Sequence, residues 1–220
     1  MITRPPAANA MGSAAVVGGL GVFTVTAVMA RRRVVDPAER EVFRSINDLP
    51  RGLLPPVYVV MQAGSLGAVG VAAAAAGLWG RPRLASSLGV TGTAVWGGCK
   101  VIKNWVGRGR PAEHIAHTTI RGAVAHGLGF PSGHSAVAFA LATIAARDVP
   151  PSVRPVLWAG AAIVATARVY VGAHFPLDVI GGAALGIAVG SAVRLLSRGT
   201  DPNQLVTPAP SPSPAGTRLR

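Results

Sequence analysis

Charged and aromatic residues are scarce in this sequence, and cysteine is almost absent. Only 13% of the 220 residues are charged and 5% are aromatic, whereas half are hydrophobic. A soluble domain carries about a quarter charged residues, so the shortage indicates a surface that largely faces something other than water. The single cysteine, Cys99, lies in an apolar stretch. One cysteine excludes a disulfide framework or a multi-cysteine metal site within the chain.

Acidic residues are also few, with eight Asp and Glu against 21 Lys and Arg and a net charge of +13. A strongly basic surface can bind nucleic acid. Here, however, the cations stand mostly singly between apolar runs, without a basic helix or an aromatic stacking platform. Positive charges that flank membrane spans account for this pattern better. We therefore expect membrane lipids, and no nucleic acid, as partners.

Apolar runs recur at about the length needed to cross a bilayer, which is about 20 residues. The predicted spans cover residues 12–30, 56–79, 84–102, 134–146, 156–172 and 177–196. A cleaved signal peptide is an alternative reading of the first run, but its arginines follow the run rather than precede it, which favours a retained helix. Because a spanning backbone must satisfy its own hydrogen bonds, the sequence predicts an all-α, polytopic membrane bundle of about six transmembrane helices.

A short interfacial helix is predicted between the first two spans, in residues 34–53. Its apolar residues Val42, Phe43, Ile46 and Leu49 recur at helical spacing. Charged residues stand between them: Glu39, Arg40, Glu41, Arg44 and Asp48. This alternation is typical of an amphipathic helix that lies on a membrane surface.

The remaining segments set the predicted domain limits. Residues 104–130 are polar, glycine-rich and basic, and form a loop too charged for lipid. We expect an N-terminal tail over 1–11, one transmembrane domain over 12–198 and a disordered Pro- and Ser-rich tail over 199–220.

Glycines recur at four-residue spacing in the last predicted span, at Gly182, Gly186 and Gly190. This spacing lets a neighbouring helix approach closely. It also arises often by chance in a glycine-rich chain, so it is a weak signal by itself.

Three polar clusters interrupt the apolar chain, and the last contains Arg168, His174 and Asp178. Charged groups at membrane depth are costly and require a reason. His174 and Asp178 are four residues apart, so a carboxylate can orient the imidazole and leave its other nitrogen free to attack. The alternative is a histidine that caps a helix end without a reactive role.

The middle cluster, Pro131-Ser132-Gly133-His134, stands where the polar loop becomes the fourth span. A helix N-terminus presents free N–H groups and a positive dipole end, which suit a phosphate. Ser132 adds a hydroxyl, Gly133 permits close approach, and His134 can donate a proton to a leaving oxygen. An ordinary serine cap beside a surface histidine is the alternative.

The first cluster supplies cations. Lys103 and Arg110 flank a glycine-containing turn and can converge on one anion. Arginine binds phosphate oxygens in a bidentate manner, and lysine acts as a point charge. Flanking charge at the end of a span is the alternative reading.

Together the clusters resemble the signature of the type-2 phosphatidic acid phosphatase superfamily, which reads K-x6-R-P, P-S-G-H and S-R-x5-H-x3-D. Lys103 to Pro111 matches the first part, Pro131 to His134 the second, and Arg168 to Asp178 the third. The order and the spacing over about 75 residues make chance agreement very improbable. One position departs, because Ala167 stands where the signature has serine. That change removes a hydroxyl beside the predicted site.

The resemblance implies a membrane lipid phosphate phosphatase that uses no cofactor and no metal. His174 would be the nucleophile, Asp178 would orient it, and His134 would be the acid and base. The implied phosphate-binding residues are Lys103, Arg110, Ser132, Gly133 and Arg168. Family topology would put the site on the extracytoplasmic side of the cell membrane. Nine Lys and Arg would then be cytoplasmic and twelve external, which opposes the positive-inside rule.

Other functions stay open from the sequence alone. A lipid phosphotransferase and a soluble relative are two alternatives, and a third is a non-enzymatic membrane transporter in which the polar residues line a pathway. His114, His117 and His126 lie in the polar loop, but with Glu113 as the only carboxylate nearby a zinc site is not favoured. The lipid substrate and the oligomeric state cannot be read from the residues. Polyprenyl diphosphate, phosphatidate, phosphatidylglycerophosphate and polyprenyl phosphosugars all qualify as substrates.

Overall fold

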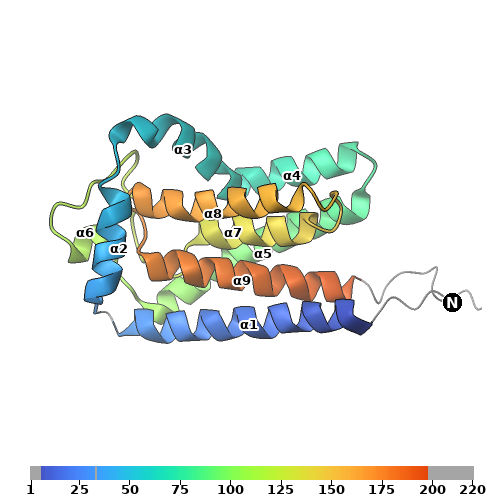
Figure 1. Cartoon of the computed structure of the whole chain (residues 1–220), viewed down its shortest axis with the longest axis horizontal. Coiled ribbons are helices and arrows are strands. Elements are labelled where there is room, and N and C mark those ends of the chain that lie inside the picture. Colours follow the sequence, from blue (N-terminus) through green and yellow to red (C-terminus); the bar gives the residue numbers. More distant parts are fainter. Residues whose placement is uncertain (1–5, 33, 198–220) are drawn as a thin grey trace, which may run out of the picture.

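The computed structural model describes residues 6–32 and 34–197, and in that part of the chain every regular element is a helix (Figure 1). The elements are α1 (Pro6–Arg31), α2 (Pro37–Asn47), the 3-10 helix η1 (Arg51–Leu53), α3 (Leu54–Met61), the 3-10 helix η2 (Gln62–Gly64), α4 (Leu66–Leu78), α5 (Pro82–Val106), α6 (Pro111–His114), α7 (Gly133–Ala145), α8 (Arg154–Tyr170) and α9 (Pro176–Leu196). The predicted tail 199–220 and the first five residues of the predicted tail 1–11 lie outside the described residues. The helix α1 begins at Pro6, earlier than the predicted start at residue 12.

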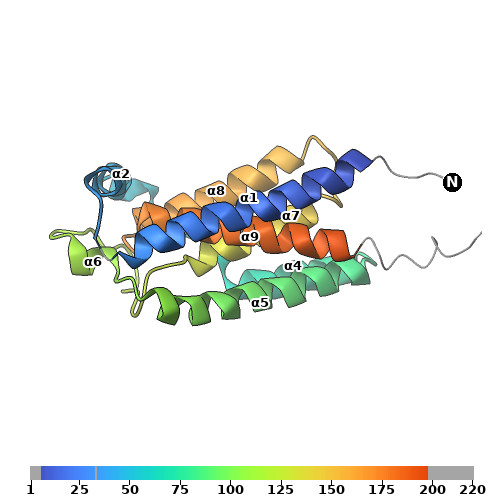
Figure 2. The same ribbon diagram turned by 90° about the horizontal axis from the view of Figure 1, so that it is seen from below.

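The helices α1, α4, α5, α7, α8 and α9 run roughly along the long axis of the described structure, and α3 is inclined to them (Figures 1 and 2). The short helices α2 and α6 lie at one end of the bundle, where α1 ends and α9 begins. At the opposite end, Gly12 at the start of α1 packs against Leu195 at the end of α9. The predicted all-α membrane bundle with a short helix across one end is thus confirmed.

Two helices are long and apolar enough to cross a membrane by themselves. These are the segment Ala10–Arg31 of α1 and the whole of α9, each with a mean hydropathy of 1.8. The bent pair Arg51–Gly64 and Leu66–Leu78 makes a third candidate if it counts as one span. The other helices along the long axis are shorter or carry more charge, because they end in the polar clusters. Large apolar side chains such as Val71 and Val90 are about 70% exposed, as expected for surfaces that face lipid.

The second predicted span, residues 56–79, is not one continuous helix. It breaks at η2, and the two halves are bent by 67°. Ser65 begins α4, since its hydroxyl accepts the Ala68 N–H at 3.2 Å. At Gly64 an added Cβ would lie 2.5 Å from the carbonyl oxygen of His134. The break therefore brings the chain against the start of α7.

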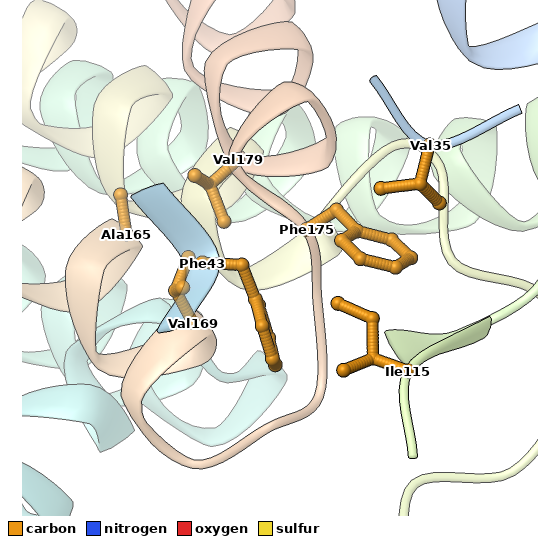
Figure 3. Packing of buried hydrophobic residues seen from close by; sticks show 7 residues of the cluster. All are labelled: Val35, Phe43, Ile115, Ala165, Val169, Phe175 and Val179. Atoms are coloured by element: carbon orange, nitrogen blue, oxygen red, sulfur yellow. The ribbon is translucent and has the colours of Figure 1, made fainter. Parts of the chain in front are cut away.

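The helix α2 is amphipathic, but its buried face differs from the predicted one. Phe43 is buried and packs against Phe175, with ring centroids 5.5 Å apart (Figure 3). Val42 is 48% exposed, whereas Glu39, expected on the polar face, is 8% exposed. The reason is that Glu39 has charged and polar partners inside the protein, which offset the cost of burial.

The glycines of α9 allow very close packing against α7. A Cβ at Gly182 would collide with the carbonyl oxygen of Ser132, and one at Gly186 with that of Ala136. At Gly190 it would lie 2.9 Å from Thr143. The four-residue spacing thus serves helix contact. The contact places the start of α7 directly beside the start of α9.

Candidate active site

The eight residues singled out by the sequence come from five parts of the fold and meet at the end of the bundle that carries α2 and α6. They are Lys103 at the end of α5, Arg110 in the following loop, Ser132, Gly133 and His134 at the start of α7, Arg168 near the end of α8, and His174 and Asp178 at the start of α9. The eight residues lie together because successive helices run in opposite directions, so that α5 and α8 end where α7 and α9 begin.

His174 and Asp178 form the contact that their spacing allows. The imidazole Nδ1 of His174 lies 3.3 Å from Oδ2 of Asp178. The same oxygen accepts the backbone N–H of Phe175 at 2.9 Å, which closes the first turn of α9. His174 is 3% exposed and Asp178 is completely buried. The carboxylate thus occupies Nδ1 and leaves Nε2 as the nitrogen free to react.

Lys103 and Arg110 are both bonded to backbone carbonyls of the same loop segment. The Lys103 ammonium donates to the carbonyl oxygens of Leu128, at 2.8 Å, and Gly129. The Arg110 guanidinium donates to Gly127 at 2.8 Å and to Ala173, the residue before His174, at 2.7 Å. These bonds hold both cations beside the loop that carries His174.

Arg168 approaches the site from α8. Its Nη1 donates to the sulfur of Met61 at 3.2 Å, a weak acceptor. Its buried Nε has no hydrogen-bond partner among the described residues. Arg168 and Lys103 are both near enough to act electrostatically on His134. Arg168 therefore retains donor capacity for a strong acceptor such as a phosphate oxygen.

The start of α7 is fastened to the start of α9. The backbone N–H of Ser132 donates to the carbonyl of Asp178 at 2.9 Å. The Ser132 hydroxyl accepts from the hydroxyl of Ser135 at 3.1 Å and caps α7. The Phe130–Pro131 peptide bond before it is cis. His134 is half-buried in the first turn. The two clusters are therefore parts of one structural unit.

The charges around His174 favour its neutral form. Burial lowers the pKa of His174 well below the usual 6.5, and the nearby positive charges lower it further. In decreasing order of effect, those groups are Lys103, Arg168, Arg110 and His134. The ring therefore keeps the lone pair that a nucleophile needs.

A cavity of about 210 Å³ opens beside this cluster, between the polar loop and the segment that precedes α9. Arg110, Glu113 and His126 contribute polar groups to its wall, and Ile120 and Val124 contribute apolar ones. Ala173 also lines it, so the cavity reaches the residue next to His174. Its volume suits a small polar group.

Ala167, which stands where serine was expected, is turned into the protein interior. It is 2% exposed and packs with Met61, Tyr170 and Val171. A serine hydroxyl there would enter an apolar cluster, and alanine fits these surroundings well.

Sequence reasoning missed two residues that touch the cluster, Arg108 and Glu39. Arg108 Nη1 donates to Asp178 Oδ1 at 3.0 Å, and the guanidinium also pairs with Glu39 on α2. Burial by itself would lower the pKa of Arg108, but the hydrogen bonds and charges of Glu39 and Asp178 outweigh it and raise the pKa. The sequence did hold a signal for Arg108, because it lies inside the motif between Lys103 and Arg110. The chain has only eight acidic residues with which this arginine could pair.

The histidines of the polar loop do not gather into a metal site. Within residues 6–32 and 34–197, no three His, Cys, Asp or Glu side chains lie close enough together to hold a metal ion. His114 instead packs on Phe175, with ring centroids 5.9 Å apart. His117 and His126 are exposed.

Comparison with known proteins agrees with this architecture. Crystal structures of LpxE from Aquifex aeolicus and of the first transmembrane PAP2 type phosphatidylglycerolphosphate phosphatase from Bacillus subtilis are similar, each with a TM-score of 0.65. LpxE is 26% identical, over 70% of this chain and 93% of its own. The Bacillus protein is 20% identical, over 86% of this chain and 98% of its own, and shows the shared fold. No curated protein sequence matches.

The fold is therefore that of an integral-membrane helical bundle with two histidines and several cations at one end. The family profile of the PAP2 superfamily matches residues 83–200, more than half of the chain. The chain belongs to this superfamily of phosphatases.

Proposed function

We propose that the chain hydrolyses a lipid phosphate ester or diphosphate without a metal, through a phosphohistidine on His174. The observation that carries the proposal is the arrangement around this ring. Its Nδ1 faces Asp178, its Nε2 is free, and positive charges from three helices and a loop surround it. Such a pocket suits an electron-rich nucleophile attacking an anionic phosphoryl group.

In the first step, Nε2 of His174 attacks phosphorus, and the bond between phosphorus and the leaving oxygen breaks. His134 gives its proton to that oxygen, so an alcohol leaves from a phosphate ester and a lipid monophosphate leaves from a diphosphate. Asp178 stabilises the positive charge that develops on the phosphorylated ring. The cations of Lys103, Arg110 and Arg168 stabilise the equatorial oxygens.

In the second step, water attacks the phosphohistidine. His134, now neutral, takes a proton from this water, and the bond between phosphorus and nitrogen breaks. Inorganic phosphate leaves, and His174 returns to its neutral form. The hydroxyl of Ser132 and the N–H of Gly133, at the positive end of α7, add to the phosphate site. Each group thus acts without a metal ion.

The substrate class follows from the position of the cluster. It lies at one end of an apolar bundle, where a charged head can reach the cations while acyl or prenyl chains stay in lipid. The cavity of about 210 Å³ beside Arg110 suits the remainder of a polar head. Phosphatidate, phosphatidylglycerophosphate, polyprenyl diphosphate and polyprenyl phosphosugars meet these conditions.

We place the site on the extracytoplasmic side of the cell membrane. Of the twelve Lys and Arg on that side, Lys103, Arg110 and Arg168 face the cluster, and Arg108 and Arg121 are buried in hydrogen bonds. Seven then remain, against the nine that the family topology would make cytoplasmic, which agrees with the positive-inside rule. A cysteine at the exposed Val124 should react with an impermeant thiol reagent on intact cells. Wild type is the control because Cys99 is buried, and labelling only after lysis would reverse the orientation.

The acid side of the pH profile should reflect His174. Since its lowered pKa keeps the ring neutral, activity is present above that value and is lost only as the pH falls through it. We therefore expect the acid limb of kcat/KM below pH 6.5. The acid limb should be measured with two substrates whose phosphate pKa values differ. If the titrating group belongs to the enzyme, the limb falls at the same pH with both substrates. A limb at or above 6.5 would contradict this assignment.

The function is tested by phosphate release from a panel of these lipid phosphates, with EDTA and orthovanadate as separate additions. We expect release that EDTA leaves intact and orthovanadate inhibits. Transfer of phosphate to an added alcohol in place of water would favour a phosphotransferase. No release from any lipid, together with no orthovanadate effect, would favour a transporter.

A further inference from the structure

The most deeply buried large polar side chain near the cluster is not one of the eight residues above. Arg108 is 2% exposed and lies between two carboxylates, Glu39 and Asp178. Its Nη1 is 3.1 Å from Oε1 of Glu39 and 3.0 Å from Oδ1 of Asp178, and its Nη2 donates to the other oxygen of Glu39. A continuous chain of contacts therefore runs from Glu39 to the imidazole of His174.

Each carboxylate oxygen of Glu39 and Asp178 has a hydrogen-bond partner. Asp178 uses Oδ1 for Arg108 and Oδ2 for His174 and the Phe175 N–H. Glu39 also accepts the backbone N–H of Leu177 at 3.0 Å. That N–H belongs to the first turn of α9, where a helix leaves donors unsatisfied. Glu39 thus reaches from α2 to the same turn that carries Asp178.

The packing around the guanidinium leaves it little freedom. The carbon of the Arg108 guanidinium lies 4.6 Å from the centroid of the Phe175 ring. The same ring also packs against Phe43 of α2, as Figure 3 shows. The orientation of Asp178 is therefore set by Arg108, and the orientation of Arg108 is set by Glu39 and Phe175.

The charges give this arrangement a second consequence. With both carboxylates ionised, Glu39, Arg108 and Asp178 together carry one negative formal charge. Without the carboxylate of Glu39, Arg108 would cancel Asp178 completely, beside a ring already surrounded by three other cations. The positive charge that develops on His174 during the reaction would then lose its negative counter-charge. An anionic substrate would still meet the same positive charges.

We propose that Glu39 and Arg108 are positioning residues for His174. Glu39 holds Arg108 so that its guanidinium fixes Asp178, and the carboxylate of Glu39 preserves the negative charge that Asp178 presents to the ring. This inference rests on the proposed function. It predicts an effect on the chemical step and not on the binding of the phosphate, because the three phosphate-binding cations remain in place.

The test compares Glu39→Gln with Glu41→Gln. Both remove one carboxylate from α2, but Glu41 is exposed and outside the cluster. The substrate is dioctanoyl phosphatidate in mixed micelles, or the best lipid of the panel, and the inhibition constant of the product, inorganic phosphate, reports anion binding. For Glu39→Gln we expect kcat about 10–100-fold lower, as for other groups that orient a reactive ligand, with KM and the phosphate inhibition constant as in wild type or lower. Glu41→Gln should match wild type.

A merely structural role of Glu39 gives a different result. It would raise KM and the inhibition constant of inorganic phosphate while it lowers kcat, and that outcome overturns the proposal, as does an unchanged kcat. If Glu39→Gln does not fold, the double variant Glu39→Gln with Arg108→Gln decides, because it removes both members of the Glu39–Arg108 pair and keeps one negative charge, on Asp178, beside His174. A wild-type kcat in the double variant overturns the proposal, and a reduced kcat with a wild-type inhibition constant for inorganic phosphate supports it. Wild type without phosphate release would instead refute the proposed function.

Discussion

Replacing His174 by alanine is expected to abolish phosphate release, with a loss of roughly 10⁴-fold or more, as for other covalent nucleophiles. The reason is that no other buried imidazole in the described structure has Nδ1 against a carboxylate and Nε2 free. Radiolabelled phosphate from the substrate should be trapped on wild type as an acid-labile, base-stable adduct. The variant should show no such adduct.

The loss should be confined to chemistry. Lys103, Arg110 and Arg168 are untouched in the variant, so the binding of inorganic phosphate should change little. The matched control is His117→Asn, since His117 is exposed and has a φ of 61° that asparagine tolerates. This control should keep full turnover. A folded His174→Ala protein that still releases phosphate at the wild-type rate would disprove the phosphohistidine mechanism.

Replacing His134 by alanine should lower turnover of an alkyl phosphate by about 10²–10⁴-fold, the usual contribution of a general acid and base. The size of this loss in turnover should depend on the leaving group. A nitrophenolate leaves without a proton, so the first step with nitrophenyl phosphate should be nearly unaffected. Hydrolysis of the intermediate still needs a base, so the phosphoenzyme should accumulate and give a burst of about one nitrophenol per enzyme.

The dependence on the leaving group separates this role from simple support of the site. His134 touches Gly64 through its backbone carbonyl, which alanine retains. The packing at the break in the α3–α4 pair should therefore survive the substitution. An equal loss for alkyl and nitrophenyl phosphates, without a burst, would show that His134 acts only as a structural residue.

Much of the fold was predictable because apolar length and flanking charge are local properties. The runs that became α5, α7, α8 and α9 were located to within a few residues, and α1 begins six residues before its predicted start. The break between α3 and α4 was not predicted, because Gly64 and Ser65 stand in an apolar run that reads as continuous. Its cause is the close approach of Gly64 to α7, a contact far away in sequence.

The residues of the candidate site also divide into those that local sequence motifs predict and those that depend on distant contacts. Lys103, His134 and His174 were recognisable because their motifs have fixed spacing. Glu39 was not, since it looks like any charged residue on the solvated side of an amphipathic helix. Its burial depends on Arg108, 69 residues away, and that pairing exists only when α2 lies across the end of the bundle.

The sequence by itself determined the helical class and the membrane environment, and it predicted the reactive groups, because these follow from composition and local spacing. Only the tertiary structure decided which cations surround the ring of His174, which polar residues turn inward, and how closely α7 and α9 pack. These properties depend on contacts between distant segments. Close approach of the backbone at Gly182 and Gly186 brings the two histidine-bearing turns together, and buried charges are stable there only with partners that folding supplies.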